Sequence, residues 1–149
     1  MTKVLIVHAD DSIAVSTVFS DDVAAAIAKT EQSYLNSPEI ANKAPFKSWR
    51  IIDESEIPAD RSYRNAWRDT GAGIEHDMTR ARELHKDKLR REREPKLEAL
   101  DVEYQRADEQ GDNQKKQQIA AQKQALRDIT KDPRIAAAVI IDSLKKIVV

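Results

Sequence analysis

Residues 61–128 carry the feature that most constrains how this chain of 149 residues can fold. Charged side chains make up 34% of the whole sequence, and their excess lies in the second half, where large apolar side chains are sparse. A helix with so little apolar surface gains stability mainly by pairing with another helix, in the same chain or in a partner. The segment contains no cluster of catalytic type. It therefore predicts assembly or interaction, and we expect no enzymatic activity.

Two helical arms are predicted within this region. The first begins at Met78 and reaches residue 110, with a kink or restart at Pro95, because proline cannot donate a helical hydrogen bond. Residues 111–113 (Gly-Asp-Asn) predict a turn, and the second arm covers residues 114–129. We expect the two arms (78–110 and 114–129) to fold back as an antiparallel hairpin.

Each arm carries one narrow apolar stripe, which is enough for one packing partner. Four stripe residues are predicted to form a protein interface: Leu97, Leu100, Tyr104 and Leu126.

Residues 135–149 are the most apolar part of the chain, and their periodicity leaves open whether they form a strand or a buried helix. Because an exposed patch of this kind is sticky, we expect the tail to dock on the β-rich unit or on a neighbouring subunit.

The first 58 residues predict a small ββαβ unit. Residues 3–8 and 12–19 are rich in β-branched side chains, a helix follows to about residue 35, and residues 46–52 predict a third strand. The expected core is aliphatic apart from one tryptophan: Val4, Ile6, Ile13, Val15, Val18, Ile27, Trp49 and Ile51. The predicted fold class is α+β, with a β-rich unit at 1–58 and a helical region at 59–149.

An arginine and aromatic cluster opens the second region. Residues 61–69 predict a short helix that places Tyr63 and Trp67 on one side, ended by the glycines at 71 and 73. One interpretation is that the rings pin this helix onto the β-rich unit. The other is an interface anchor made of Arg61, Tyr63, Arg64 and Trp67, because Trp, Tyr and Arg dominate binding hot spots. The two interpretations are compatible and weigh evenly.

The spacing of the candidate residues argues against metal, phosphate and nucleic-acid sites. His8, His76 and His85 form no HxxxH or HExxH pattern, so no metal site and no cofactor are expected. The acids at 10–11 are predicted to form a turn between strands, and residues 71–73 lack the GK[ST] ending of a phosphate loop. The run at residues 86–96 holds six bases but also three acids and no aromatic residue. It predicts a solvated helix face and not a nucleic-acid site.

Net charge, cysteine content and the length of the apolar runs indicate where in the cell we expect the protein. The net charge is −1, the chain has no cysteine, and no apolar run approaches the length of a membrane span. The first residues lack the apolar core and cleavage site of a signal peptide. We therefore expect a soluble protein made in the cytoplasm, with no membrane contact.

Residues 57–133 contain four motifs in a fixed order: RSYRNAW, AREL-HKDKLRR, PKLEALDVEYQRADEQGD and KQALRDIT. With these motifs the segment resembles a widespread group of small tailed-phage proteins. Members of that group are encoded among tail genes and are similar to tail-assembly and tail-fibre-assembly proteins. The resemblance implies a phage structural or assembly protein, made in the host cytoplasm and located in the virion, but it fixes no role more closely.

We therefore expect a non-enzymatic structural subunit of a tailed-phage virion, associated with the tail or tail fibre and acting through protein–protein interfaces. Its expected partners are other virion or tail proteins, in a homo-oligomer or a larger assembly. One alternative is a tail or fibre assembly chaperone that is absent from the mature particle. Another is a nucleic-acid-associated virion protein.

Overall fold

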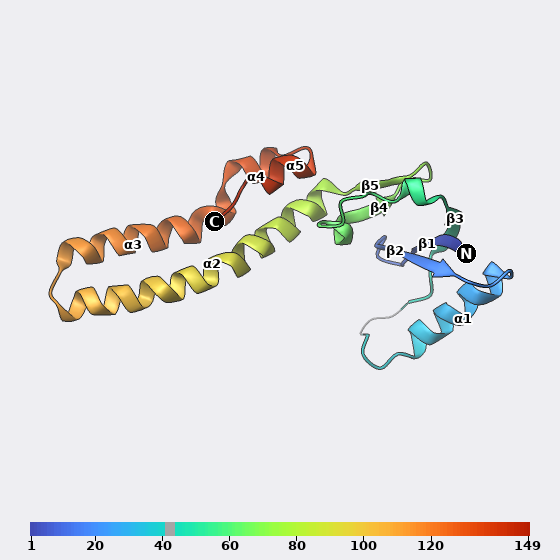
Figure 1. Cartoon of the computed structure of the whole chain (residues 1–149), viewed down its shortest axis with the longest axis horizontal. Coiled ribbons are helices and arrows are strands. Elements are labelled where there is room, and N and C mark those ends of the chain that lie inside the picture. Colours follow the sequence, from blue (N-terminus) through green and yellow to red (C-terminus); the bar gives the residue numbers. More distant parts are fainter. Residues whose placement is uncertain (41–43) are drawn as a thin grey trace. The chain divides into compact units, whose positions relative to one another are not determined.

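Two compact units, Met1–Asp77 and Met78–Val149, make up the chain in a computed structural model that describes residues 1–40 and 44–149. The strands β1 to β5 belong to the first unit and the helices α2 to α5 to the second (Figure 1). The predicted α+β class is confirmed.

An antiparallel sheet organises the first unit. Its strands β1 (Thr2–Val7), β2 (Ile13–Val18) and β3 (Ser48–Ile52) lie in the order β2-β1-β3, and α1 (Val23–Asn36) connects β2 to β3. The predicted ββαβ order is confirmed. The carboxylate of Asp22 caps α1 by accepting a hydrogen bond from the Ala25 amide at 3.0 Å, which explains where this helix begins.

The central strand β1 is buried on both faces of the sheet. Val4 and Ile6 pack with α1 on one face, whereas Leu5 and Val7 pack on the other. Six of the eight expected core residues are buried or half-buried: Val4, Ile6, Ile13, Val15, Val18 and Ile27. The other two, Trp49 and Ile51, were wrongly expected in the core, since they are 40% and 57% exposed. Both lie on the α1 face, but on edge strand β3, and the apolar cluster beneath α1 gathers residues of β1 and β2 instead.

The segment before the second unit is not the predicted helix 61–69. It forms the 3-10 turns η1 (Glu54–Glu56) and η2 (Arg64–Ala66), then a β-hairpin of β4 (Trp67–Asp69) and β5 (Ile74–His76). Gly71 in the hairpin turn has φ +80°, a conformation that favours glycine. Ile57 and Ile74 pack against the second face of the sheet. Residues 59–77, grouped with the helical region on sequence, thus lie in the first unit.

An antiparallel hairpin of α2 (Met78–Glu109) and α3 (Asn113–Asp128) dominates the second unit (Figure 1). Gly111, at φ +67°, forms the predicted turn, and Asp112 caps α3. The helix α2 continues through Pro95, so the expected restart is wrong, while the expected kink stays a prediction. Pro95 and Arg91 are both exposed, so water can take over the hydrogen bond that proline cannot donate to the residue 91 carbonyl.

The apolar tail forms short helices that pack on α2. After the 3-10 turn η3 (Ile129–Lys131) come α4 (Pro133–Ala137) and α5 (Ile141–Lys145). The tail's buried side chains are Ile135, Ala138, Ile141, Leu144 and Ile147. Two α2 side chains hold the tail backbone: Arg82 donates to the Ala138 carbonyl at 2.9 Å, and Nε2 of His85 lies 3.0 Å from the Ile147 carbonyl. The tail therefore packs against α2 within the second unit, whereas the sequence predicted docking on the β-rich unit or on a neighbouring subunit.

Candidate functional site

The hairpin seam brings the predicted interface residues of the second unit onto facing stripes. Leu97, Leu100 and Tyr104 recur at helical spacing on α2 and are half-buried, as is Leu126 on α3. Towards the turn the seam closes, since Ala107 of α2 and Ile119 of α3 are both buried. These residues hold the two arms together, so only their partly exposed sides remain for a further partner.

Two lysines of α3 flank the ring of Tyr104. The Nζ atoms of Lys116 and Lys123 lie 5.8 and 5.4 Å from the ring centroid, within the range of a cation–π interaction. Each lysine also pairs with an α2 carboxylate, Lys116 with Asp108 and Lys123 with Asp101. The bond to Asp108 raises the pKa of Lys116 above its ordinary value. Tyr104 thus serves the contact between the arms.

On the side of Tyr104 away from the hairpin turn, an open apolar groove of about 540 Å³ lies between the two arms. Its lining consists of Lys96, Ala99, Leu100, Gln122, Ala125, Leu126, Ile129 and Val149. Ala99 and Ala125 are exposed and small, which leaves the space between the helices unfilled. At one end, Nζ of Lys96 donates to a Val149 oxygen at 2.7 Å. An open apolar hollow between two helices is a candidate docking surface for another chain segment.

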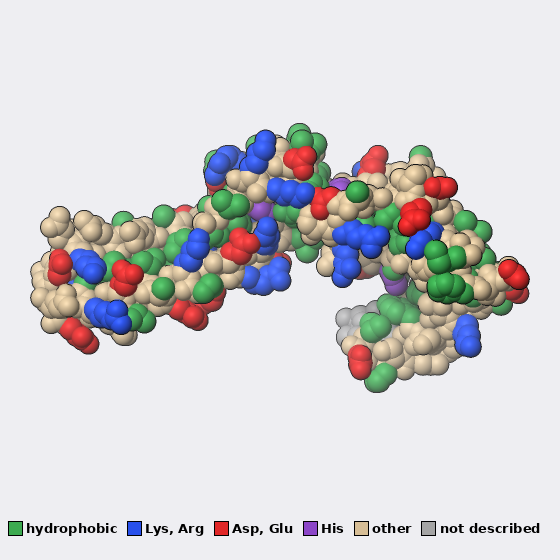
Figure 2. Space-filling view, in the orientation of Figure 1, with side chains coloured by type: hydrophobic (Ala, Val, Ile, Leu, Met, Phe, Trp, Pro, Cys, Tyr) green, Lys and Arg blue, Asp and Glu red, His purple; other side chains and the backbone are tan. Residues whose placement is uncertain are grey.

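Charged side chains of both signs are distributed along the hairpin. Figure 2 shows hydrophobic, basic and acidic side chains interspersed along it. In the run 86–96, Lys88 pairs with Glu92 and Arg90 with Asp87, while Arg93 donates to the Arg127 carbonyl near the end of α3 at 2.7 Å. Because half of the six bases are engaged in these ways and Lys96 and Lys86 have partners too, the run resembles a solvated helix face more than a phosphate-binding surface.

The arginine and aromatic cluster divides between core and surface. Tyr63 and Trp67 are only 5% and 6% exposed, and Nε1 of Trp67 donates to Nε2 of His76 at 3.1 Å. Both rings are therefore buried, as the first interpretation expects, although the segment that carries them is a 3-10 turn and a strand and not the predicted helix. Arg61 and Arg64 are exposed, so any interface role falls to these two arginines.

Both arginines line a second cleft, of about 450 Å³, which the sequence reading missed. One wall comes from the sheet, with Lys3, Ile13, Ala14, Val15 and Thr17, and the other from the segment before the hairpin, with Ile57, Arg61, Arg64, Asn65 and Trp67. Nζ of Lys3 donates to Oγ1 of Thr17 at 2.9 Å across β1 and β2. No sequence spacing links residue 3 to residue 61, because only the folded sheet brings them together.

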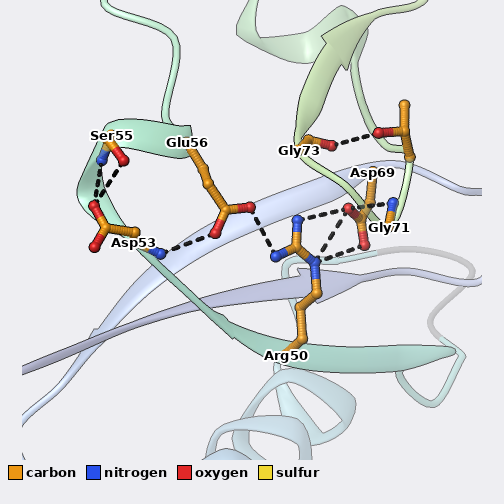
Figure 3. Close-up of polar contacts among 8 residues, drawn as sticks. Arg50, Asp53, Ser55, Glu56, Asp69, Gly71 and Gly73 are labelled. Atoms are coloured by element: carbon orange, nitrogen blue, oxygen red, sulfur yellow. Dashed lines mark hydrogen bonds and ion pairs between the residues drawn. The ribbon is translucent and has the colours of Figure 1, made fainter.

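Arg50 ties three elements of the first unit to one another (Figure 3). It donates to Glu56 of η1 at 2.8 Å and to Asp69 of β4 at 2.9 Å. The Arg50 hydrogen bond is the main cause that lowers the pKa of Asp69. For Glu56, the Asp53 backbone amide lowers the pKa first and Arg50 second. The carboxylates are engaged by the guanidinium and by nearby amides, so this network holds the fold.

The remaining candidates have structural partners. His8 packs on Tyr34 and Phe46, with ring centroids 5.3 Å from each, and Asp10 accepts from the Ser12 amide in the β1–β2 turn, as predicted for a turn acid. Residues 71–73 follow strand β4 rather than the expected helix, and they lead into another strand. Among residues 1–40 and 44–149, no group of three or more His, Cys, Asp and Glu side chains is arranged to hold a metal ion.

Comparison with known proteins found no match to a protein-family model, a curated protein or a solved structure. Within the described residues, none of the helices combines the length and the apolar character needed to cross a membrane. The tailed-phage resemblance of residues 57–133 thus stays a prediction from sequence, and the two surfaces described above are what the structure adds to it.

Proposed function

We propose that this chain is a non-enzymatic structural subunit of a tailed-phage virion, associated with the tail or tail fibre. The groove of about 540 Å³ on the flank of the α2–α3 hairpin carries the proposal, because it is an open apolar surface between two helices that can receive side chains of another chain. The tail-gene resemblance over residues 57–133 supplies the biological setting. The expected partner is another virion or tail protein, including further copies of this chain.

The engagement of the reactive side chains supports a role without catalysis. His85 is 1% exposed and bound to the tail backbone, and His76 accepts from Trp67. Arg50 is held by two carboxylates. Groups that serve as general acids or bases need access to a substrate, and these serve the fold.

An assembly chaperone remains the second candidate, because a groove that docks a tail protein permanently and one that docks it temporarily have the same chemistry. Copy number separates the two. A subunit stays in the particle, whereas a chaperone co-purifies with free tail proteins only.

Docking in the groove is tested by filling it. Ala125 lines the groove and is exposed, so Ala125→Arg blocks the hollow without entering the seam. Ala120 is also exposed, does not line the groove, and lies roughly 140° away around the same helix. In co-expression with tail proteins of the encoding phage, Ala125→Arg should lose the partner that the parent chain and Ala120→Arg retain. Equal retention by both variants would remove the groove from the proposal.

A further inference from the structure

Strand β2 has a free edge. In the order β2-β1-β3 it lies at the side of the sheet, and among the described residues it pairs with β1 alone. The His8 amide donates to the Ser12 carbonyl at 2.8 Å in the turn between β1 and β2. Because hydrogen-bonded and non-hydrogen-bonded pairs alternate in an antiparallel ladder, the backbone groups of Ile13, Val15 and Thr17 point away from β1. They are available to another strand.

The cleft of the first unit lies along this edge. Ile13, Val15 and Thr17 line it, together with Ala14, whose side chain belongs to the opposite face of the sheet. Since residues of both faces contribute, the cleft reaches the strand edge itself. Ile57 and the arginine-bearing segment form its far wall. A cleft of about 450 Å³ beside a free edge can hold a few residues of extended chain.

The charge of the cleft differs from the charge of the unit around it. Residues 1–77 contain eight Lys and Arg against thirteen Asp and Glu, a net charge of −5. The cleft lining nevertheless holds three bases, Lys3, Arg61 and Arg64, and no acid. Other arginines of the unit have carboxylate partners, as Arg68 has Glu75. In the part of the chain that the structure describes, neither Arg61 nor Arg64 forms an ion pair. Positive charge therefore gathers where the strand edge is open.

We propose that this cleft binds an extended acidic segment of a partner protein, which adds to β2 as a fourth strand of the sheet. Strand addition supplies main-chain hydrogen bonds, and alternate side chains enter the cleft. Acidic side chains at alternate positions of the bound segment point into the cleft. Their carboxylates pair with Arg61 and Arg64, and their aliphatic carbons cover Ile13 and Val15. This inference concerns the first unit and does not depend on the hairpin groove or on a virion role.

Charge and shape favour an acidic peptide over a nucleic acid. The net charge of −5 repels a phosphate backbone beyond the cleft. Single strands also need exposed aromatic platforms for their bases, and the aromatic residue in the lining, Trp67, is only 6% exposed. A short carboxylate-bearing strand needs only the cleft itself.

Fluorescence anisotropy with a labelled octapeptide of alternating Glu and Thr tests the proposal on the full chain. The double variant Arg61→Gln, Arg64→Gln should weaken binding by about tenfold or more, since both side chains are exposed and removable without unfolding. The matched control Arg68→Gln, outside the cleft, should stay within about twofold. Failure of the parent chain to bind, or equal binding by the double variant, overturns the proposal.

Strand addition has its own readout. Hydrogen exchange of the Ile13, Val15 and Thr17 amides should slow by about tenfold or more when the peptide is bound, because these amides gain acceptors. A peptide N-methylated at alternate positions on its β2-facing edge should bind much more weakly. Unchanged exchange, or full binding by the methylated peptide, would show attraction without pairing and contradict the inference. Oligothymidylate, a single-stranded DNA, serves as a competitor at the same concentration of negative charge. If it displaced the peptide, the preference for an acidic protein segment over a nucleic acid would be contradicted.

Discussion

Replacing Trp67 tests whether the aromatic cluster is a core element or an exposed anchor. Its ring is 6% exposed, and its N–H donates to His76. Trp67→Ala should cost roughly 3–5 kcal/mol, as for other large rings removed from a core. A unit of this size has a total stability of only about 4–12 kcal/mol, so the alanine variant removes a large share of it and unfolds a unit whose stability lies at the low end.

Trp67→Phe gives a measurable intermediate. It keeps an aromatic ring in the core but removes the hydrogen bond to His76, a loss of about 0.5–1.5 kcal/mol. With the smaller ring, the expected destabilisation is about 1–3 kcal/mol. At a urea dependence of about 1 kcal/mol per molar, the unfolding midpoint of the first unit should fall by roughly 1–3 M.

Fluorescence isolates the first unit in this experiment. Both tryptophans, Trp49 and Trp67, lie in it, so Trp49 still reports on its unfolding when Trp67 is replaced. Far-ultraviolet circular dichroism follows the helices in parallel. Trp49→Phe is the matched control, and since Trp49 is 40% exposed it should shift stability by no more than about 0.5 kcal/mol. If Trp67→Phe unfolds at the parent midpoint, the core assignment of the ring is refuted.

Three further predictions concern the second unit. Burial holds the pKa of His85 below its ordinary 6.5, so the unfolded chain binds the proton first. The unit should lose stability as the pH falls through about 6.5 and below it, and His85→Gln should flatten this dependence in urea melts. Leu100→Asp places a charge in the half-buried seam and should separate the arms or the partner, whereas Glu98→Gln should be silent in the same melts and in co-purification. Residues 86–96 should give no DNA binding that weakens steeply between about 50 and 200 mM salt, and a micromolar complex that did so would favour the nucleic-acid alternative.

Local patterns predicted the elements that depend on neighbouring residues. Gly111 and Asp112 marked the hairpin turn, and the β-branched runs around the Asp10–Asp11 pair marked the first two strands. The spacing of Tyr63, Ala66 and Trp67 matched a helix, but a 3-10 turn followed by a strand buries the same three residues. The β4–β5 pairing outweighed that local preference.

Contacts between residues far apart in the sequence could not be predicted, because no local pattern specifies them. Arg50 meets Asp69 across 19 positions, and Arg82 meets the tail backbone across 56. Ile51 alternates as a core strand residue does, yet its place on an edge strand leaves it 57% exposed. The cleft beside β2 belongs to the same class, since it joins Lys3 to arginines more than fifty residues away.

Quantitative mass spectrometry of purified particles of a phage that carries this sequence tests the proposed virion role most directly. A structural subunit should be present at a fixed copy number relative to the known tail proteins, and Ala125→Arg should lower that number while Ala120→Arg leaves it unchanged. Absence of the parent chain from complete particles would contradict a structural role. Its recovery bound to free tail proteins in the same lysate would then identify an assembly chaperone.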